Sequence, residues 1–335
     1  MNYSPGKSTS LHLLGVLLVT VIPAIDAAED WTMPRTEFGQ PDPQGVWYYG
    51  SGTDFVRSEA LGTKQNYTDA EALAVAQSLQ AIDVAQAQNL DPGRVAPTAG
   101  TPIAQEADLQ FSTTRVNMVQ INGEYRTSQI ISPANGRWPY REGGLDFFEK
   151  LQALGFGAFD GPEIRPVSER CTGPNAGPAA PMVGWFYNAN MQIIQSADYV
   201  ILSAEMTHDV RIIPLDPAMP IPAYAQWMGH STGYWEGNTL VVESKKFRPE
   251  QSWFFFRHSD QLEVIERFTL SSPDEIYYSY TITDPEILSE PVTVERNITR
   301  RALGEYVYEY ACHEGNYSLP GILAGARRLE QEIQN

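Results

Sequence analysis

Two short stretches of the sequence carry residues suited to acid–base chemistry. Residues 312–314 read Cys-His-Glu, and residues 169–171 read Glu-Arg-Cys. A disulfide between the two cysteines would gather an imidazole, two carboxylates and a guanidinium, and neighbouring charges and burial shift the pKa values of such groups toward neutrality. The alternative is a salt-bridge network around a structural disulfide. The candidate catalytic residues of this cluster are His313, Glu314, Arg170 and Glu169.

Cys171 and Cys312 are the only cysteines in the chain. In an exported protein an even pair is most simply a disulfide, with two free thiols or a shared metal as the alternatives. Residues 155–184 are rich in Gly and Pro and show no periodicity. Loops of this length in compact domains are usually functional or disordered. A disulfide at Cys171 would fasten this loop, which favours a functional role for it.

The predicted strand over residues 206–215 presents a second candidate. Alternation places the even-numbered residues on one face and the odd-numbered residues on the other, so either His208 or Arg211 points into the core. A core histidine with satisfied hydrogen bonds is the alternative to a ligand-contacting or catalytic His208. Glu266 and Arg267 pose the same question in a later strand. The candidate ligand-binding residues are Arg211, Trp235, Glu266 and Tyr187.

Residues 229–233 match the G-x-S-x-G pattern of α/β-hydrolases around Ser231. That motif requires a buried strand before the serine and a helix after it. Here two prolines precede it and a predicted hairpin follows, so the pattern indicates a turn that opens a strand.

Metal and cofactor motifs are missing from the sequence. The five histidines show no H-x-H or H-E-x-x-H spacing, so no sequence-local metal site is predicted, although distant strands could still assemble one. No glycine-rich phosphate loop is present, and we predict no cofactor. The formal net charge of −18 argues against nucleic acid and anionic membrane surfaces as partners. The oligomeric state stays open.

The first 27 residues read as a cleavable export signal. Lys7 precedes a short apolar run, residues 11–22, and Ala27 ends an acceptable cleavage site. The run is shorter than the roughly 20 residues that a membrane-spanning helix needs. We therefore predict a soluble mature protein without a membrane span, periplasmic or secreted after cleavage near Ala27.

The remaining chain is predicted to be mainly β with a few flanking helices. Residues 28–110 form a wrapping segment with one helix, which starts at a Thr68–Glu71 capping box. Residues 111–335 form an antiparallel β domain with a hairpin at Asn122-Gly123, the 155–184 loop and a C-terminal helix. Closely spaced strands without intervening helices favour a lipocalin-like up-and-down barrel or a strongly bent sheet. The predicted strands span 192–195, 199–205, 210–215, 233–236, 239–246, 262–270, 275–283 and 292–300, with 306–311 as a further candidate.

Several sequence blocks resemble a family of uncharacterised exported bacterial proteins. They include WMGHSTGYWEGNTLVVESKKF, ERFTL and YEYACHEGN, and the resemblance covers roughly residues 115–328. It implies export and a β-rich fold. Two functions follow from the residues. The first, which the ionisable residues within these blocks favour, is a cofactor-free acid–base enzyme (lyase, isomerase or hydrolase) that acts on an apolar or aromatic small molecule. The second is a non-catalytic carrier of the same kind of molecule. Convergence of the ionisable residues into one pocket would favour the enzyme.

Overall fold

The computed structural model describes residues 31–86, 92–93, 95, 118–172, 180–183, 188–252 and 256–334. The predicted export signal and Tyr187 lie outside these residues. Contacts divide the chain into two units, Met1–Thr32 and Met33–Asn335, and the second unit holds all the elements below.

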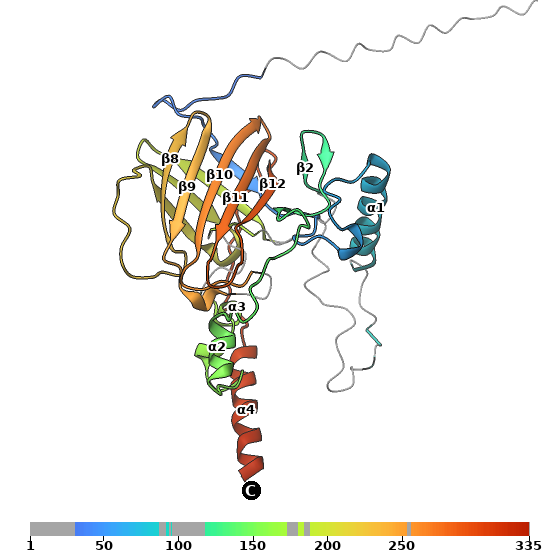
Figure 1. Ribbon diagram of the computed structural model, residues 1–335, viewed down its shortest axis with the longest axis vertical. Coiled ribbons are helices and arrows are strands. Elements are labelled where there is room, and N and C mark those ends of the chain that lie inside the picture. The colour runs from blue at the N-terminus through green and yellow to red at the C-terminus, as the bar shows by residue number, and fades with distance from the viewer. Residues whose placement is uncertain are drawn as a thin grey trace, which may run out of the picture. The chain divides into compact units, whose positions relative to one another are not determined.

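A ten-stranded antiparallel sheet dominates the described part of the chain and is bent nearly into a barrel (Figure 1). Nine strands follow one path in the order β7-β6-β5-β1-β12-β11-β10-β9-β8, and β4 pairs with β12 off this path. The strands are β1 (Gly45–Tyr48), β4 (Ile130–Ser132), β5 (Asn190–Gln195), β6 (Tyr199–Ala204), β7 (Val210–Pro214), β8 (His230–Glu236), β9 (Thr239–Lys245), β10 (Glu263–Ser272), β11 (Glu275–Thr283) and β12 (Val292–Arg300). The predicted mainly β fold is confirmed.

Strand β1 and the candidate strand 306–311 differ from the predictions. β1 comes from the predicted wrapping segment, yet it lies in the middle of the sheet between β5 and β12. Its Val-Trp-Tyr run favours a strand, but it is only four residues long and follows a Pro-rich stretch that resembles a surface loop. The candidate strand 306–311 is not a strand.

The sheet does not close by backbone pairing between β7 and β8. Every neighbour on the nine-strand path is antiparallel, so the first and last strands run in the same direction. No ladder joins them within the described residues. Side chains seal part of this seam instead. Arg211 Nε donates to Ser231 Oγ across it at 2.9 Å. Gly233 packs so closely that an added Cβ would lie 2.9 Å from Ile213 Cγ2.

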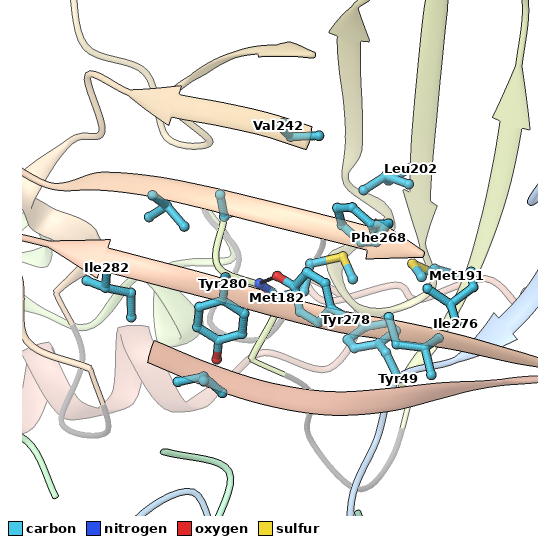
Figure 2. Packing of buried hydrophobic residues seen from close by; sticks show 14 of the residues in the cluster. Tyr49, Met182, Met191, Leu202, Val242, Phe268, Ile276, Tyr278, Tyr280 and Ile282 are labelled. Atoms are coloured by element: carbon cyan, nitrogen blue, oxygen red, sulfur yellow. Dashed lines mark hydrogen bonds between the residues drawn. The ribbon is translucent and has the colours of Figure 1, made fainter. Parts of the chain in front are cut away.

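The core lies inside the bent sheet (Figure 2). Alternate residues of β10, β11 and β12 are buried, as expected for strands with one face inward. Most of these inward side chains are aliphatic or aromatic, and a few are charged or phenolic: Glu266, Tyr278, Tyr280 and Arg296. The interior therefore combines an apolar core with a small set of polar groups.

Helices and a short hairpin flank the sheet. The helices are α1 (Asp69–Gln86), α2 (Phe147–Ala153), α3 (Val167–Arg170) and α4 (Ser318–Gln334), with one-turn 3-10 segments η1 (Glu59–Leu61), η3 (Pro162–Ile164), η4 (Met206–His208) and η5 (Pro249–Gln251). Both hydrogen bonds of the Thr68–Glu71 capping box are present at the start of α1. β2 (Gln120–Ile121) and β3 (Glu124–Tyr125) form the predicted hairpin, with positive φ at Asn122 and Gly123.

No helix among the described residues has the length and apolar character that crossing a bilayer demands.

Candidate functional site

A pocket of about 790 Å³ lies along the seam between β7 and β8. Its volume falls in the range of about 300–1,000 Å³ that is typical of small-molecule sites. The apolar lining residues include Val210, Ile212, Met219, Ile221, Trp227 and Met228, and the polar ones include Thr172, Asp209, Arg211, His230, Thr232 and Arg248. We call this cavity the seam pocket.

The connection between β7 and β8, residues 215–229, forms one wall of the seam pocket. Its prolines, at 217, 220 and 222, lack the N–H that a strand ladder needs, so the segment cannot fill the seam as a regular strand. Backbone hydrogen bonds hold the end of the connection beside the residues that follow β9. Gln226 N donates to Lys246 O at 3.0 Å, and Arg248 N donates to Gln226 O at 2.9 Å. The connection therefore leaves and rejoins the sheet on either side of the pocket.

Trp227 is the largest aromatic side chain of the pocket wall. The Arg248 guanidinium lies 4.4 Å from its ring centroid, and the Arg170 guanidinium lies 5.9 Å from it. A guanidinium within about 6 Å of a ring centroid is attracted to the face of the ring. Arg170, predicted here as a catalytic residue, thus reaches the margin of the seam pocket.

Asp209 is a half-buried carboxyl group in the pocket wall. Burial raises its pKa above the ordinary value, against a hydrogen bond from Thr207 Oγ1 and the charge of His208, which lower it. Shifted carboxyl groups in clefts are candidates for functional roles. Asp209 was not among the residues predicted from the sequence, where its only distinction is its place beside His208.

Replacing Asp209 by asparagine is expected to raise thermal stability at pH 7. The folded-state pKa is raised, so the native state holds its proton more tightly, and stability falls as pH rises from the ordinary value through the shifted one. The variant lacks this loss and should melt about 1–3 °C above the wild type at pH 7. At a pH below the ordinary carboxyl range the two proteins should melt alike. If the two proteins differed in melting temperature by the same amount at both pH values, the raised pKa of Asp209 would be refuted.

Behind the pocket, Arg211 and Glu266 form an ion pair inside the barrel. Arg211 Nη1 donates to Glu266 Oε1 at 3.1 Å, and Nη2 donates to both Glu266 Oε2 and Ser244 Oγ. Tyr278 Oη donates to Glu266 Oε1 at 2.7 Å. The same oxygen accepts from Met182 N at 3.0 Å (Figure 2). Both charges are almost fully buried. This network joins β7, β8, β9, β10 and β11, so it holds the pocket's inner wall in place.

The structure shows which polar residues of β7 and β10 face inward. Arg211 and Glu266 point into the barrel, and Arg267 points outward to Glu236. His208 does not occupy a strand position, since η4 ends at His208 and β7 begins at Val210. The predicted strand 206–215 is therefore too long. His208 is exposed, and its Nδ1 donates to Tyr310 O at 2.9 Å.

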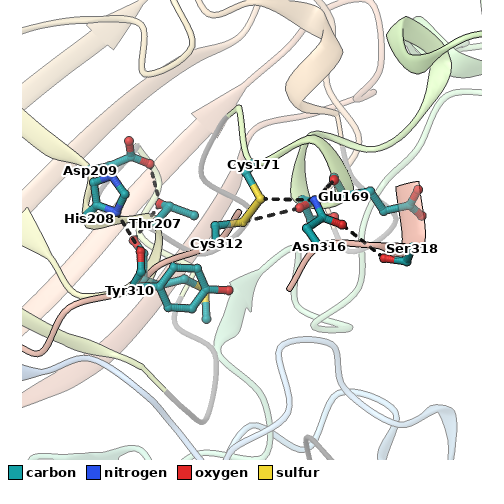
Figure 3. The surroundings of a disulfide bond; sticks show 11 residues. Glu169, Cys171, Thr207, His208, Asp209, Tyr310, Cys312, Asn316 and Ser318 are labelled. Atoms are coloured by element: carbon teal, nitrogen blue, oxygen red, sulfur yellow. Dashed lines mark hydrogen bonds between the residues drawn. A yellow bond between two sulfur atoms is a disulfide. The ribbon is translucent and has the colours of Figure 1, made fainter. Parts of the chain in front are cut away.

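Cys171 and Cys312 form the expected disulfide (Figure 3). The charged residues around it do not build one network among the described contacts. His313 and Glu314 are exposed. Glu169 receives two hydrogen bonds from Arg165, at 2.6 and 2.8 Å, across the turn that joins η3 to α3. The structure therefore brings the two stretches together without making His313, Glu314, Glu169 and Arg170 converge in a pocket.

Of the other residues considered in the sequence, Trp235 lies apart from the seam pocket and Ser231 lines it. Trp235 points inward near the β8–β9 turn, beside Leu240 and Phe268. Ser231 Oγ is within 2.8 Å of Ser244 Oγ in addition to its bond from Arg211. It thus belongs to a strand and not to a nucleophile elbow.

The described residues contain no cluster of three or more His, Cys, Asp or Glu side chains arranged to hold a metal ion.

Comparison with known proteins provides no relative from which a role for the seam pocket could be transferred. No protein-family model and no curated protein matches the sequence.

Proposed function

We propose that this protein is an exported, non-catalytic carrier that binds an apolar or aromatic small molecule in the seam pocket. The observation that carries the proposal is the pocket itself. It offers about 790 Å³ at the one place where the described strand path stays open. Apolar side chains beside a few polar groups are the usual composition of such sites. The disulfide is compatible with export, and the first 27 residues read as the signal.

The placement of the acid–base residues favours a carrier over an enzyme. His208, His313 and Glu314 are exposed at the surface. Arg211 lines the pocket, but Glu266 neutralises its charge from inside the barrel. A general acid or base must lie within hydrogen-bonding reach of the substrate proton, and none of the predicted catalytic carboxylates or imidazoles lines the pocket. One observation favours the enzyme instead, namely the raised pKa of Asp209, which does line it.

Binding is tested with N-phenyl-1-naphthylamine, an uncharged aromatic probe whose fluorescence rises in apolar surroundings. We expect saturable binding to the wild type. Ile212→Trp should weaken binding at least tenfold, because the indole would occupy pocket volume. Ile212 is 58% exposed, so the change should leave the fold intact.

Ile265→Trp is the matched control. Ile265 is also an outward-facing strand isoleucine, 45% exposed, and it does not line the pocket. This variant should bind the probe like the wild type. Equal binding by Ile212→Trp and Ile265→Trp would reject the seam pocket as the binding site.

A further inference from the structure

Arg296 is a fully buried cation inside the barrel. It lies in the middle of β12, and alternation turns its side chain inward between Val294 and Ile298. Tyr278 is its direct cross-strand partner on β11. Tyr280 lies on the same face as a diagonal neighbour of Arg296, at the distance of about 7–8 Å that long side chains can bridge.

The guanidinium of Arg296 has no hydrogen-bond acceptor among the described residues. Its Nε, Nη1 and Nη2 atoms are all buried and unsatisfied, and so is the Tyr280 hydroxyl. Its electrostatic neighbours are four tyrosines, Tyr48, Tyr49, Tyr278 and Tyr280, and burial lowers its pKa. Figure 2 shows the rings of Tyr49, Tyr278 and Tyr280 together in this part of the core.

The two nearby buried carboxylates serve other donors. Glu266 accepts from Arg211 and from Tyr278. Glu205, which acts electrostatically on Tyr49, accepts from Asn188 Nδ2 at 2.9 Å and Asn190 Nδ2 at 2.8 Å. Neither carboxylate is hydrogen-bonded to Arg296 among the described contacts, so the barrel interior holds a cation without a counter-ion.

An unpaired buried guanidinium is costly. Arginine stays protonated in proteins, and removing an ion from water costs several kcal/mol unless an opposite charge and hydrogen bonds compensate. Five N–H donors in a planar fork match the two oxygens of a carboxylate. The tyrosine rings beside the fork provide apolar surface for the body of such a molecule.

We propose that the barrel interior contains an anion site, separate from the seam pocket, in which Arg296 and the Tyr280 hydroxyl bind the carboxylate of a small aromatic acid or an inorganic anion in its place. The site uses none of the residues on which the carrier proposal rests.

The test compares thermal melting of the wild type, Arg296→Met and Arg267→Met in sodium benzoate, sodium chloride and sodium sulfate at one ionic strength. A ligand that binds only the native state raises the melting temperature. We expect benzoate to raise that of the wild type and of Arg267→Met by about 3 °C or more and that of Arg296→Met by less than about 1 °C. Arg267 faces outward, so its variant controls for loss of a positive charge.

The salts distinguish the two sources of the anion. The Arg296-dependent shift is the shift of the wild type minus that of Arg296→Met, which removes the general stabilisation by sulfate. A larger Arg296-dependent shift in benzoate than in chloride or sulfate assigns the site to an organic acid, and equal Arg296-dependent shifts in all three assign it to an inorganic anion. Shifts of the same size in the wild type and Arg296→Met, or no shift in any salt, would overturn the proposal. If Arg296→Met still binds N-phenyl-1-naphthylamine like the wild type, the anion site is independent of the seam pocket, and the two proposals are tested separately.

Tyr280→Phe keeps the proposal testable if Arg296→Met does not fold. Losing the hydroxyl removes one neutral hydrogen bond, so calorimetry should show anion affinity about five- to tenfold weaker than in the wild type. Unchanged affinity would remove Tyr280 from the site and contradict the proposal as stated.

Discussion

Replacing Glu266 by leucine is expected to lower the free energy of unfolding by about 3–5 kcal/mol. The substitution leaves Arg211 as an uncompensated charge in the barrel and removes the acceptor of the Tyr278 hydroxyl. Urea unfolding measures the loss. Because most small domains are stable by only about 5–15 kcal/mol, this single change would remove a large part of the total.

Two further variants show whether the loss arises from the unpaired charge. The double variant Arg211→Met/Glu266→Leu should lose less stability than Glu266→Leu alone, since neither charge of this pair is then left buried without its partner. Glu236→Gln breaks the outward pair with Arg267, the residue next to Glu266, and should cost no more than about 1 kcal/mol. A Glu266→Leu protein as stable as the Glu236→Gln protein would contradict the role of the buried pair.

Loss of the disulfide should have an effect of similar size. The bond closes a loop across 141 positions, and the double variant Cys171→Ser/Cys312→Ser releases that constraint in the unfolded chain. The loop-entropy model places the cost at about 5 kcal/mol. Reductant should destabilise the wild type to a similar extent and leave the double variant unchanged. Two reactive thiols in the native wild type would show that the bond does not form.

The strands could be predicted because their local signals agree with the fold. β10 and β11 alternate buried with partly or fully exposed residues over nine or ten positions, and turn residues separate them. β12 follows the same alternation except at Glu295, which is also buried. The exception is β1, whose four residues are too few to show alternation and whose partners lie more than 140 positions away in sequence. Only the tertiary pairing reveals it as a central strand.

The seam pocket was harder to predict because it lies between β7 and β8, the two strands at the ends of the sheet. The alternation predicted one inward polar residue from each of two sets, His208 or Arg211 and Glu266 or Arg267, and it named Arg211 and Glu266 as ligand-binding residues. The structure turns these two inward, where they bind each other. Sequence reasoning did not find Asp209, Trp227 or Arg248, which come together only where the 215–229 connection spans the seam. His313 attracted attention through its neighbours in sequence, but proximity to a disulfide did not bury it.

The inward orientation of Arg296 could be predicted from the sequence, but its surroundings could not. Its position in an alternating strand already predicts an inward guanidinium, by the reasoning applied to Arg211. What the sequence cannot show is that the neighbouring strands present tyrosines and no free carboxylate to it.

The most direct test of the carrier proposal is a crystal structure of the wild type grown with saturating N-phenyl-1-naphthylamine. The proposal predicts density for one probe molecule between β7 and β8, in contact with Ile212, Met219 and Trp227. Probe density elsewhere on the molecule, or an empty seam pocket under saturating probe, would contradict it.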